Sequence, residues 1–207
     1  CIRRSTSQGG GGTVYSQDTM DEICKIAREK NCKLHMDGAR LFNAAVASGT
    51  DPARIVRDFD TVSICLSKGL GAPVGSVLVG NKADLAEAHR RRKMFGGGMR
   101  QAGVIASAGI YALENNIERL SEDHKRARRL AEALNEMPAF SIDLDTVQSN
   151  IVFIGTGKGE TKEVISALSE QGVEILEIDD STVRAVFHLH ITGEDLEKAI
   201  EAFKHMQ

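Results

Sequence analysis

The sequence lacks long apolar runs and a marked excess of charge of either sign. Its apolar runs are only a few residues long, as at residues 77–79, so we expect no segment that spans a bilayer. The 26 basic and 29 acidic side chains give a formal net charge of -3. That balance removes the bulk electrostatic attraction that nucleic acid or an anionic membrane surface would need, so we expect neither as a partner.

Cysteine is also sparse, and the four thiols form no C-x-x-C pair and no dense framework. They stand at Cys1, Cys24, Cys32 and Cys65. Scattered thiols in a chain of this size indicate a reducing compartment and buried structural roles. The opening residues 1–4 resemble no targeting segment. We therefore expect the protein in the cytoplasm.

The remaining composition is typical of a folded protein, with 42% hydrophobic and 27% charged residues. It excludes a disordered tail, a collagen and a coiled coil. The 207 residues suffice for one large domain or two small ones with a sizeable core.

The first half of the chain predicts alternating strands and helices. A glycine run at residues 9–12 forms a flexible lead-in. Met20, Ile23 and Ile26 lie at helical spacing, and Thr19 with Glu22 has the spacing of a capping box at the helix start. Strands are expected over 33–37, 61–66 and 76–79, with a helix up to residue 47 after the first. This order predicts an α/β layer with helices packed on a mostly parallel sheet.

The second half of the chain predicts a different order of elements. Residues 82–134 are helical almost throughout, with a break at the glycines 96–98, and Pro138 marks a boundary. Smaller elements follow, which together predict a small α+β unit and a domain boundary near residues 118–128. Strands are expected over 150–154, 173–178 and 183–189, and helices over 161–171 and 194–205.

Two charged residues follow two of the predicted strands. Asp37 and Lys68 would lie in one crevice, because ligands of open α/β sheets bind outside the carboxyl ends of the strands. A lysine in a desolvated crevice is a usable amine nucleophile. An aspartate on a pyridinium nitrogen and a lysine on the aldehyde would suit pyridoxal phosphate. An ordinary salt bridge or two solvated loop residues would explain the same spacing.

We expect the histidines to have structural roles. His35 alternates with apolar neighbours, and a hydrogen-bonded structural histidine is the ordinary interpretation of such a position. His188 and His190 share one strand face, but no third ligand of suitable spacing lies near them. We therefore expect no metal site.

Four ordered motifs resemble the threonine aldolase family of fold type I pyridoxal-phosphate enzymes. They are L-H-M-D-G-A-R-L-F-N-A, S-K-G-L-G-A-P-V-G-S, G-G-G-M-R-Q-A-G and T-V-R-A-V-F-H-L. The resemblance extends from Gly11 over nearly the whole chain. It implies the carboxyl part of a cofactor-binding large domain over residues 1–118 and a small α+β domain over residues 119–207.

The resemblance also implies roles for five residues. Lys68 would bond covalently to the aldehyde of pyridoxal phosphate, and Asp37 would bond its ring nitrogen. Arg184 and Arg40 would hold the substrate carboxylate, which suits the planar fork of a guanidinium. Arg100 would serve the cofactor phosphate, in its own subunit or a neighbouring one. From the residues alone, Arg40 could equally form a salt bridge at a helix start, and Arg100 could be a surface charge.

The implied reaction is a retro-aldol cleavage of a β-hydroxy-α-amino acid, L-threonine or L-allo-threonine, to glycine and acetaldehyde. The family also implies a homo-oligomer, a dimer or a tetramer, with shared sites. Two alternatives stay open. One is a non-catalytic fragment or pseudoenzyme. Two features favour it: the Arg3-Arg4 segment is unusual, and family members carry roughly a hundred residues ahead of Gly11 that this sequence does not include. The other is a different pyridoxal-phosphate lyase that acts at the β-carbon.

Overall fold

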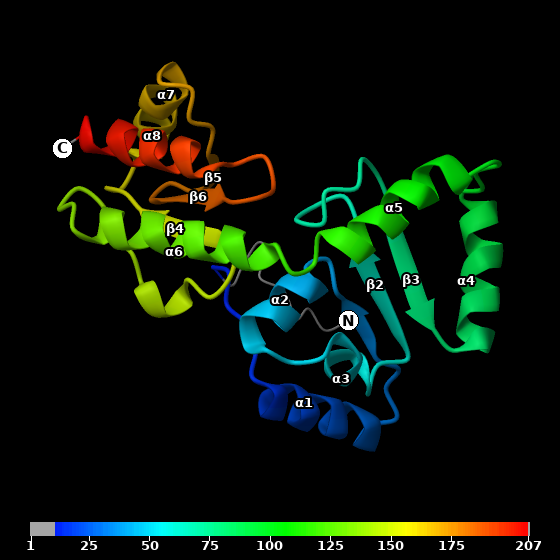
Figure 1. Cartoon of the computed structure of the whole chain (residues 1–207). Coiled ribbons are helices and arrows are strands. Elements are labelled where there is room, and N and C mark those ends of the chain that lie inside the picture. Colours follow the sequence, from blue (N-terminus) through cyan, green and yellow to red (C-terminus); the bar gives the residue numbers. More distant parts are fainter. Residues whose placement is uncertain (1–10, 207) are drawn as a thin grey trace. The chain divides into compact units, whose positions relative to one another are not determined.

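The computed structural model describes residues 11–206, which divide into two compact units (Figure 1). Unit 1 comprises residues 15–118, and unit 2 comprises residues 119–206 together with residues 11–14. The Arg3-Arg4 segment and the first two glycines of the glycine run lie outside the described residues. No helix in residues 11–206 is both long enough and apolar enough to cross a membrane.

Unit 1 contains a three-stranded sheet with the order β1-β2-β3. Strands β1 and β2 run parallel, with Asp37 opposite Ser63, whereas β3 runs antiparallel to β2. The segment between β2 and β3 contains no helix, and a parallel return would need a longer crossover connection. The expected parallel arrangement is therefore confirmed for β1 and β2, whereas β3 runs in the opposite direction. The strands are β1 His35–Asp37, β2 Thr61–Cys65 and β3 Ser76–Gly80.

Three helices pack with β1 and β2 around an apolar core (Figure 1). They are α1 Gln17–Glu29, α2 Leu41–Ser48 and α3 Pro52–Val56. Alternate residues of β2 are buried, as a strand with one covered face requires. The core consists of Met20, Met36, Leu41, Ala45, Ile55, Val62 and Ile64.

The start of α1 differs from the prediction. Ser16 is the N-cap, and its hydroxyl accepts a hydrogen bond from the Thr19 backbone N–H at 3.1 Å. The expected capping box of Thr19 and Glu22 is therefore wrong, because Thr19 already lies inside the first turn. Ile26, expected on the apolar stripe, is 51% exposed.

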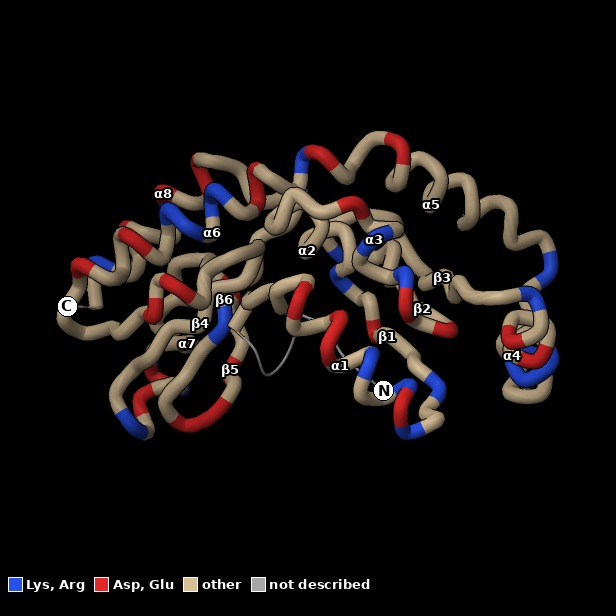
Figure 2. The backbone as a smooth tube through the Cα atoms, turned by 90° about the horizontal axis from the view of Figure 1, so that it is seen from below, with Lys and Arg blue, Asp and Glu red and all other residues tan. Residues whose placement is uncertain are grey.

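Helices α4 Lys82–Met94 and α5 Gly103–Asn115 confirm the predicted helical stretch and its break at the glycines. Asn81 caps α4 by accepting hydrogen bonds from the N–H groups of Ala83 and Asp84. No residue of α4 is buried, and both acidic and basic residues lie along the helix (Figure 2). Helix α5 lies beside β2, since a Cβ at Gly109 would approach Leu66 Cδ1 to 2.9 Å.

Unit 2 is a second three-stranded sheet, all antiparallel, with the order β4-β6-β5. Helices cover one face of this sheet, and their apolar side chains share its core, where Phe140 meets Phe203 edge to face at a centroid distance of 5.1 Å. The elements are α6 Leu120–Asn135, the 3-10 turn η1 Leu144–Thr146, β4 Ile151–Gly155, α7 Thr161–Glu170, β5 Leu176–Asp179, β6 Thr182–Val186 and α8 Gly193–Lys204.

The strand expected over residues 173–178 begins later than predicted. Gly172 adopts a positive φ of 76°, and the Val173 N–H donates to the Leu168 carbonyl at 2.9 Å. These residues therefore still cap the end of α7. Strand β5 begins only at Leu176.

Candidate active site

Asp37 is the last residue of β1 and is half-buried. Its carboxylate accepts a hydrogen bond from the Ala39 N–H at 3.2 Å, which fixes the turn that leaves the strand. Gly38 donates to the Ser63 carbonyl of β2 at 2.8 Å. A Cβ at Gly38 would lie 3.0 Å from both Ser63 O and Val62 Cγ1, so a larger residue there would force these neighbours to move by a few tenths of an ångström. The carboxylate is thereby held at the carboxyl end of the parallel pair.

Lys68 follows β2, the parallel neighbour of β1, and its side chain is exposed. Three apolar residues of the same segment, Leu66, Leu70 and Ala72, are buried and anchor it. Because parallel strands end at the same edge of a sheet, Lys68 and Asp37 both emerge at the carboxyl edge of unit 1. This is the region in which open α/β sheets bind their ligands.

The thiol of Cys65, at the end of β2, has a lowered pKa, to which the charge of Lys68 contributes least. Burial raises the pKa of the Cys65 thiol, but hydrogen bonds with Ser67 and Ser76 and the positive charge of Lys68 together lower it by more. The Cys65 Sγ lies 3.4 Å from Ser67 Oγ. The ammonium group thus acts on a partly buried thiol at the end of β2.

Arg40 stands at the N-cap position of α2 and is half-buried. It lines a small space at the carboxyl edge together with the buried Asn43, Cys65 and Leu70. Unit 1 therefore brings Arg40 next to the segment that carries Lys68. Neither Asn43 nor Cys65 was predicted as a site residue, although a polar asparagine inside the apolar sequence L-F-N-A-A was a usable signal.

Arg100 lies between α4 and α5, in an exposed stretch of unit 1. Gly97 and Gly98 pack back onto the last turn of α4, since a Cβ on them would lie 3.0 Å from Arg92 Cγ and 3.1 Å from Lys93 Cδ. Phe95 in the same stretch is 86% exposed. Arg100 is thus presented to the outside of the unit by a tightly folded glycine turn.

Arg184 belongs to unit 2, in the central strand β6. Its neighbours Val183 and Ala185 face the core, so Arg184 projects from the opposite face of the sheet, in register with Phe153. Its Nε is buried and has no hydrogen-bond partner among residues 11–206. A buried guanidinium N–H without an acceptor is costly in a folded protein, so an oxygen acceptor at this position would be stabilising.

Each unit thus presents part of the expected residue set at the end or face of a sheet. The family model described as beta-eliminating lyase matches residues 2–156, and the chain belongs to this family. The low specificity L-threonine aldolase of Escherichia coli (strain K12) is 46% identical over 187 residues, which are 89% of this chain and 54% of that protein. Low-specificity L-threonine aldolase 1 of Arabidopsis thaliana is 38% identical over 203 residues, which are 97% of this chain and 57% of that protein.

Solved structures show the same fold. A putative L-allo-threonine aldolase from Listeria monocytogenes matches all of this chain and 60% of its own, with a TM-score of 0.81 and 22% identity. The threonine aldolase of Leishmania major matches with a TM-score of 0.76 and 20% identity, over 99% of this chain and 60% of its own. These findings confirm the resemblance to threonine aldolases and the fold class. The chain spans little more than half the length of the curated relatives that it matches.

Proposed function

We propose that this chain is part of a pyridoxal-phosphate-dependent aldehyde-lyase that cleaves L-threonine or L-allo-threonine to glycine and acetaldehyde. One observation carries the proposal. Asp37 ends β1 and Lys68 follows β2, its parallel neighbour, in a chain 46% identical over 187 residues to a low specificity L-threonine aldolase. In this proposal residues 1–118 belong to the cofactor-binding domain, and residues 119–207 form the small domain.

The described residues fit pyridoxal phosphate by the chemistry of their donor groups. When bound, this cofactor supplies an aldehyde that condenses with amines and a ring that accepts electrons from the substrate. The Asp37 carboxylate would hold the protonated ring nitrogen, and the exposed Lys68 amine would bond the aldehyde carbon. Arg100, on its glycine turn, would hold the phosphate, and Arg40 would assist in holding the cofactor.

Arg184 and Arg40 would bind the carboxylate of the substrate. The buried Nε of Arg184, which lacks a partner among the described residues, supports this role because a carboxylate oxygen would satisfy it. Holding the carboxylate would fix the orientation of the substrate at the reacting bond. In the net reaction the β-hydroxyl loses its proton, the Cα–Cβ bond breaks and acetaldehyde leaves. The Cα then takes up a proton, which gives glycine.

A second candidate is a lyase that eliminates a group from the β-carbon, since the matching family model is described as beta-eliminating lyase. Such an enzyme would release pyruvate and ammonia instead of glycine and acetaldehyde. A third is a non-catalytic member of the family.

The decisive experiment is a visible absorption spectrum of the protein with added pyridoxal phosphate, beside Lys68→Ala as the control. We expect a band that the variant lacks, followed by formation of glycine and acetaldehyde from L-threonine. A folded protein without the band would exclude catalysis by this chain. A band followed by pyruvate and ammonia, from a β-substituted amino acid, would favour the second candidate.

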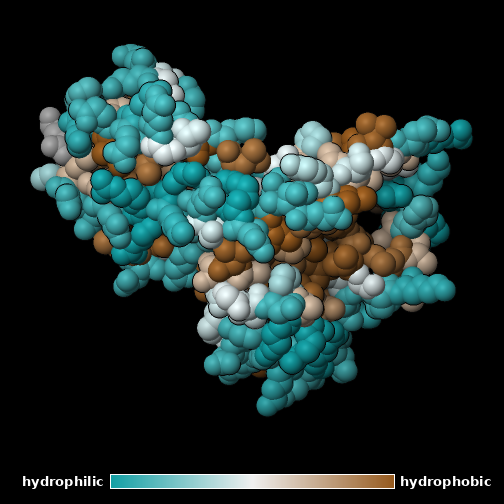
Figure 3. Space-filling model, in the orientation of Figure 1, coloured by the Kyte–Doolittle hydropathy of each residue, from teal (hydrophilic) through white to brown (hydrophobic). Residues whose placement is uncertain are grey.

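The proposal includes a homo-oligomer in a reducing compartment, the cytoplasm. The free thiols of Cys24, Cys32 and Cys65 support the compartment. Apolar side chains gather on the face of unit 1 over β3 and α5 (Figure 3), which supports burial of this surface in a larger assembly. The exposed apolar residues of β3, of α5 and of the loop before β3 are Val74, Val77, Leu78, Val79, Val104, Ile110 and Tyr111, with Leu78 on the opposite side of the strand from Val77 and Val79.

A further inference from the structure

Asn116, which directly follows α5, is connected to the segment that carries Lys68. Its backbone N–H donates to the Ala112 carbonyl at 3.0 Å and so closes the end of the helix. Its side-chain Nδ2 donates to the Leu70 carbonyl at 2.7 Å. The side chain is half-buried, and the bond joins residues far apart in the sequence. Asn116 therefore ties the end of a helix to the connection between β2 and β3.

The Leu70–Gly71 peptide group is hydrogen-bonded to both Asn116 and Lys68. Its carbonyl accepts from Asn116, and its N–H, on Gly71, donates to the Lys68 carbonyl at 2.8 Å. Both bonds belong to one rigid peptide plane, so a rotation of that plane would break both of them. A bond at one end of a peptide group also polarises the bond at the other end.

Side-chain packing alone does not fix this plane. Leu70 is buried, but Gly71 is exposed and adopts a positive φ of 75°. Glycine samples positive and negative φ with similar ease, so the backbone here has an accessible alternative unless a hydrogen bond selects one state. The Asn116 amide supplies one such bond, from outside the turn, beside the backbone bonds from Gly71 to Lys68 and from Ala72 to Leu66.

We propose that Asn116 is a positioning residue, which fixes the Leu70–Gly71 peptide and through it the backbone that presents the Lys68 amine. The functional part of this inference rests on the proposed function, whereas the structural part concerns this chain alone. Asn116 touches neither substrate nor cofactor in this proposal. It acts only through the turn that carries Lys68.

The neighbouring Asn115 is a matched control. Its Nδ2 donates to the Tyr111 carbonyl at 2.8 Å, within its own helix, and its side chain is exposed. Asn115→Ala removes the same amide group one position away and leaves the Leu70–Gly71 peptide untouched. Asn116→Asp is the second test variant, next to Asn116→Ala. Its carboxylate has the same size as the amide but cannot donate a hydrogen bond to a carbonyl.

The first measurement is hydrogen exchange of the Gly71 amide by NMR, in the protein without cofactor. We expect Asn116→Ala and Asn116→Asp to speed this exchange by roughly tenfold, since the turn loses one partly buried hydrogen bond that holds it. Asn115→Ala should leave the rate unchanged. An unchanged Gly71 rate in both folded Asn116 variants would overturn the proposal.

The second measurement is a pH titration of the absorption band formed with pyridoxal phosphate. We expect Asn116→Asp to shift its midpoint and to raise the dissociation constant for the cofactor, with Asn115→Ala like the parent. Faster Gly71 exchange with an unmoved midpoint would overturn the functional part. Absence of the band from the parent protein would instead count against the proposed function, and the exchange result would still decide the structural part.

Discussion

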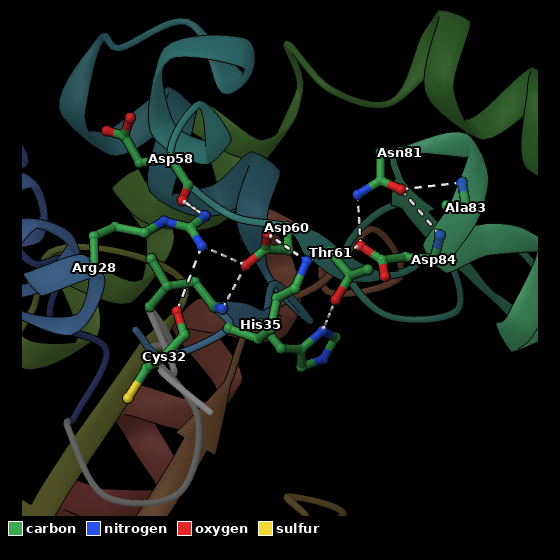
Figure 4. Close-up of polar contacts among 11 residues, drawn as sticks. Arg28, Cys32, His35, Asp58, Asp60, Thr61, Asn81, Ala83 and Asp84 are labelled. Carbon is green, nitrogen blue, oxygen red and sulfur yellow. Dashed lines mark hydrogen bonds and ion pairs between the residues drawn. The ribbon is translucent and has the colours of Figure 1, made fainter. Parts of the chain in front are cut away.

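Asp60 and Leu34 bind each other twice at the amino ends of β1 and β2. The Asp60 carboxylate accepts from the Leu34 N–H at 2.6 Å, and the Asp60 N–H donates to the Leu34 carbonyl at 2.9 Å. The same carboxylate pairs with Arg28 at 2.8 Å and with Lys33 at 3.3 Å (Figure 4). This cluster joins the two strands at the end opposite to Asp37 and Lys68.

The cluster makes the stability of unit 1 depend on pH. The Leu34 N–H, together with Arg28 and Lys33, outweighs burial and lowers the pKa of Asp60 from 3.8 to about 2. A lowered carboxyl pKa stabilises the folded state above the unfolded value and loses that contribution as the pH falls. We expect Asp60→Asn to reduce the free energy of unfolding by about 2 kcal/mol at neutral pH. Urea unfolding should show this difference shrinking as the pH falls from 3.8 towards 2.

Asp58→Asn is the control for this prediction. Asp58 pairs with its neighbour Arg57, and their side chains are 35% and 57% exposed, respectively. Its loss should change the free energy of unfolding by less than about 1 kcal/mol. A difference between parent and Asp60→Asn that stays constant over the acid range would contradict the assigned role of Asp60.

The sequence predicts the helices and strands well where local signals are strong. The break between α4 and α5 follows from three glycines, and the alternation of β2 follows from its covered face. The start of α1 was misplaced because Ser16 and Thr19 are both good caps, and only the packing of the helix decides between them. The start of β5 was predicted too early because valine, as at Val173, is common in strands. In the structure the Val173 N–H bonds the end of α7 instead of a neighbouring strand.

The site was predictable only in part, for a similar reason. Asp37 and Lys68 belong to short, specific motifs, and the topology places both at one sheet edge. Asn116 gives no such signal, since an asparagine at the end of a helix is common in any protein. Its contact with Leu70 depends on how α5 lies against β2, which no local pattern encodes.

Asp123 in α6 should be among the most sensitive positions of unit 2. Its side chain is fully buried and bonds Arg119 at 2.6 Å, and Arg126 lies 3.6 Å from the same oxygen. Removal of one partner from a buried ion pair leaves an uncompensated charge. We expect Asp123→Ala to reduce the free energy of unfolding by about 3 kcal/mol, measured by urea denaturation.

Glu122→Gln in the same helix provides the comparison. Glu122 pairs with Arg126 at 3.3 Å, but its side chain is 56% exposed. Exposed pairs of this kind contribute about 0.5 kcal/mol or less. Equal effects of the two variants would show that burial of Asp123 does not decide its contribution.

Gly38→Ala should disturb the carboxyl edge of unit 1 directly. The new Cβ would lie 3.0 Å from the Ser63 carbonyl and from Val62 Cγ1, so β1 and β2 must shift. We expect a loss of about 1 to 3 kcal/mol in the free energy of unfolding, as for other overpacked sites. Gly103→Ala, where a Cβ would meet nothing within 4 Å, should be tolerated. Thermal unfolding of both variants distinguishes local crowding from a general effect of replacing glycine.

Arg184 offers the sharpest test of substrate binding within the proposed function. Its Nε is buried without a partner among the described residues, so its removal should cost little stability. The variant would nevertheless lose a charge-assisted bond to the substrate carboxylate, which corresponds to roughly tenfold weaker binding or more. We expect Arg184→Ala to raise the KM for L-threonine and to keep the absorption band formed with Lys68.

Arg184→Lys should recover only part of the loss, because an ammonium cannot bind a carboxylate through two parallel N–H groups. Arg128→Ala, on the exposed side of α6, is the control, and an equal rise of KM in that variant would remove Arg184 from the substrate site.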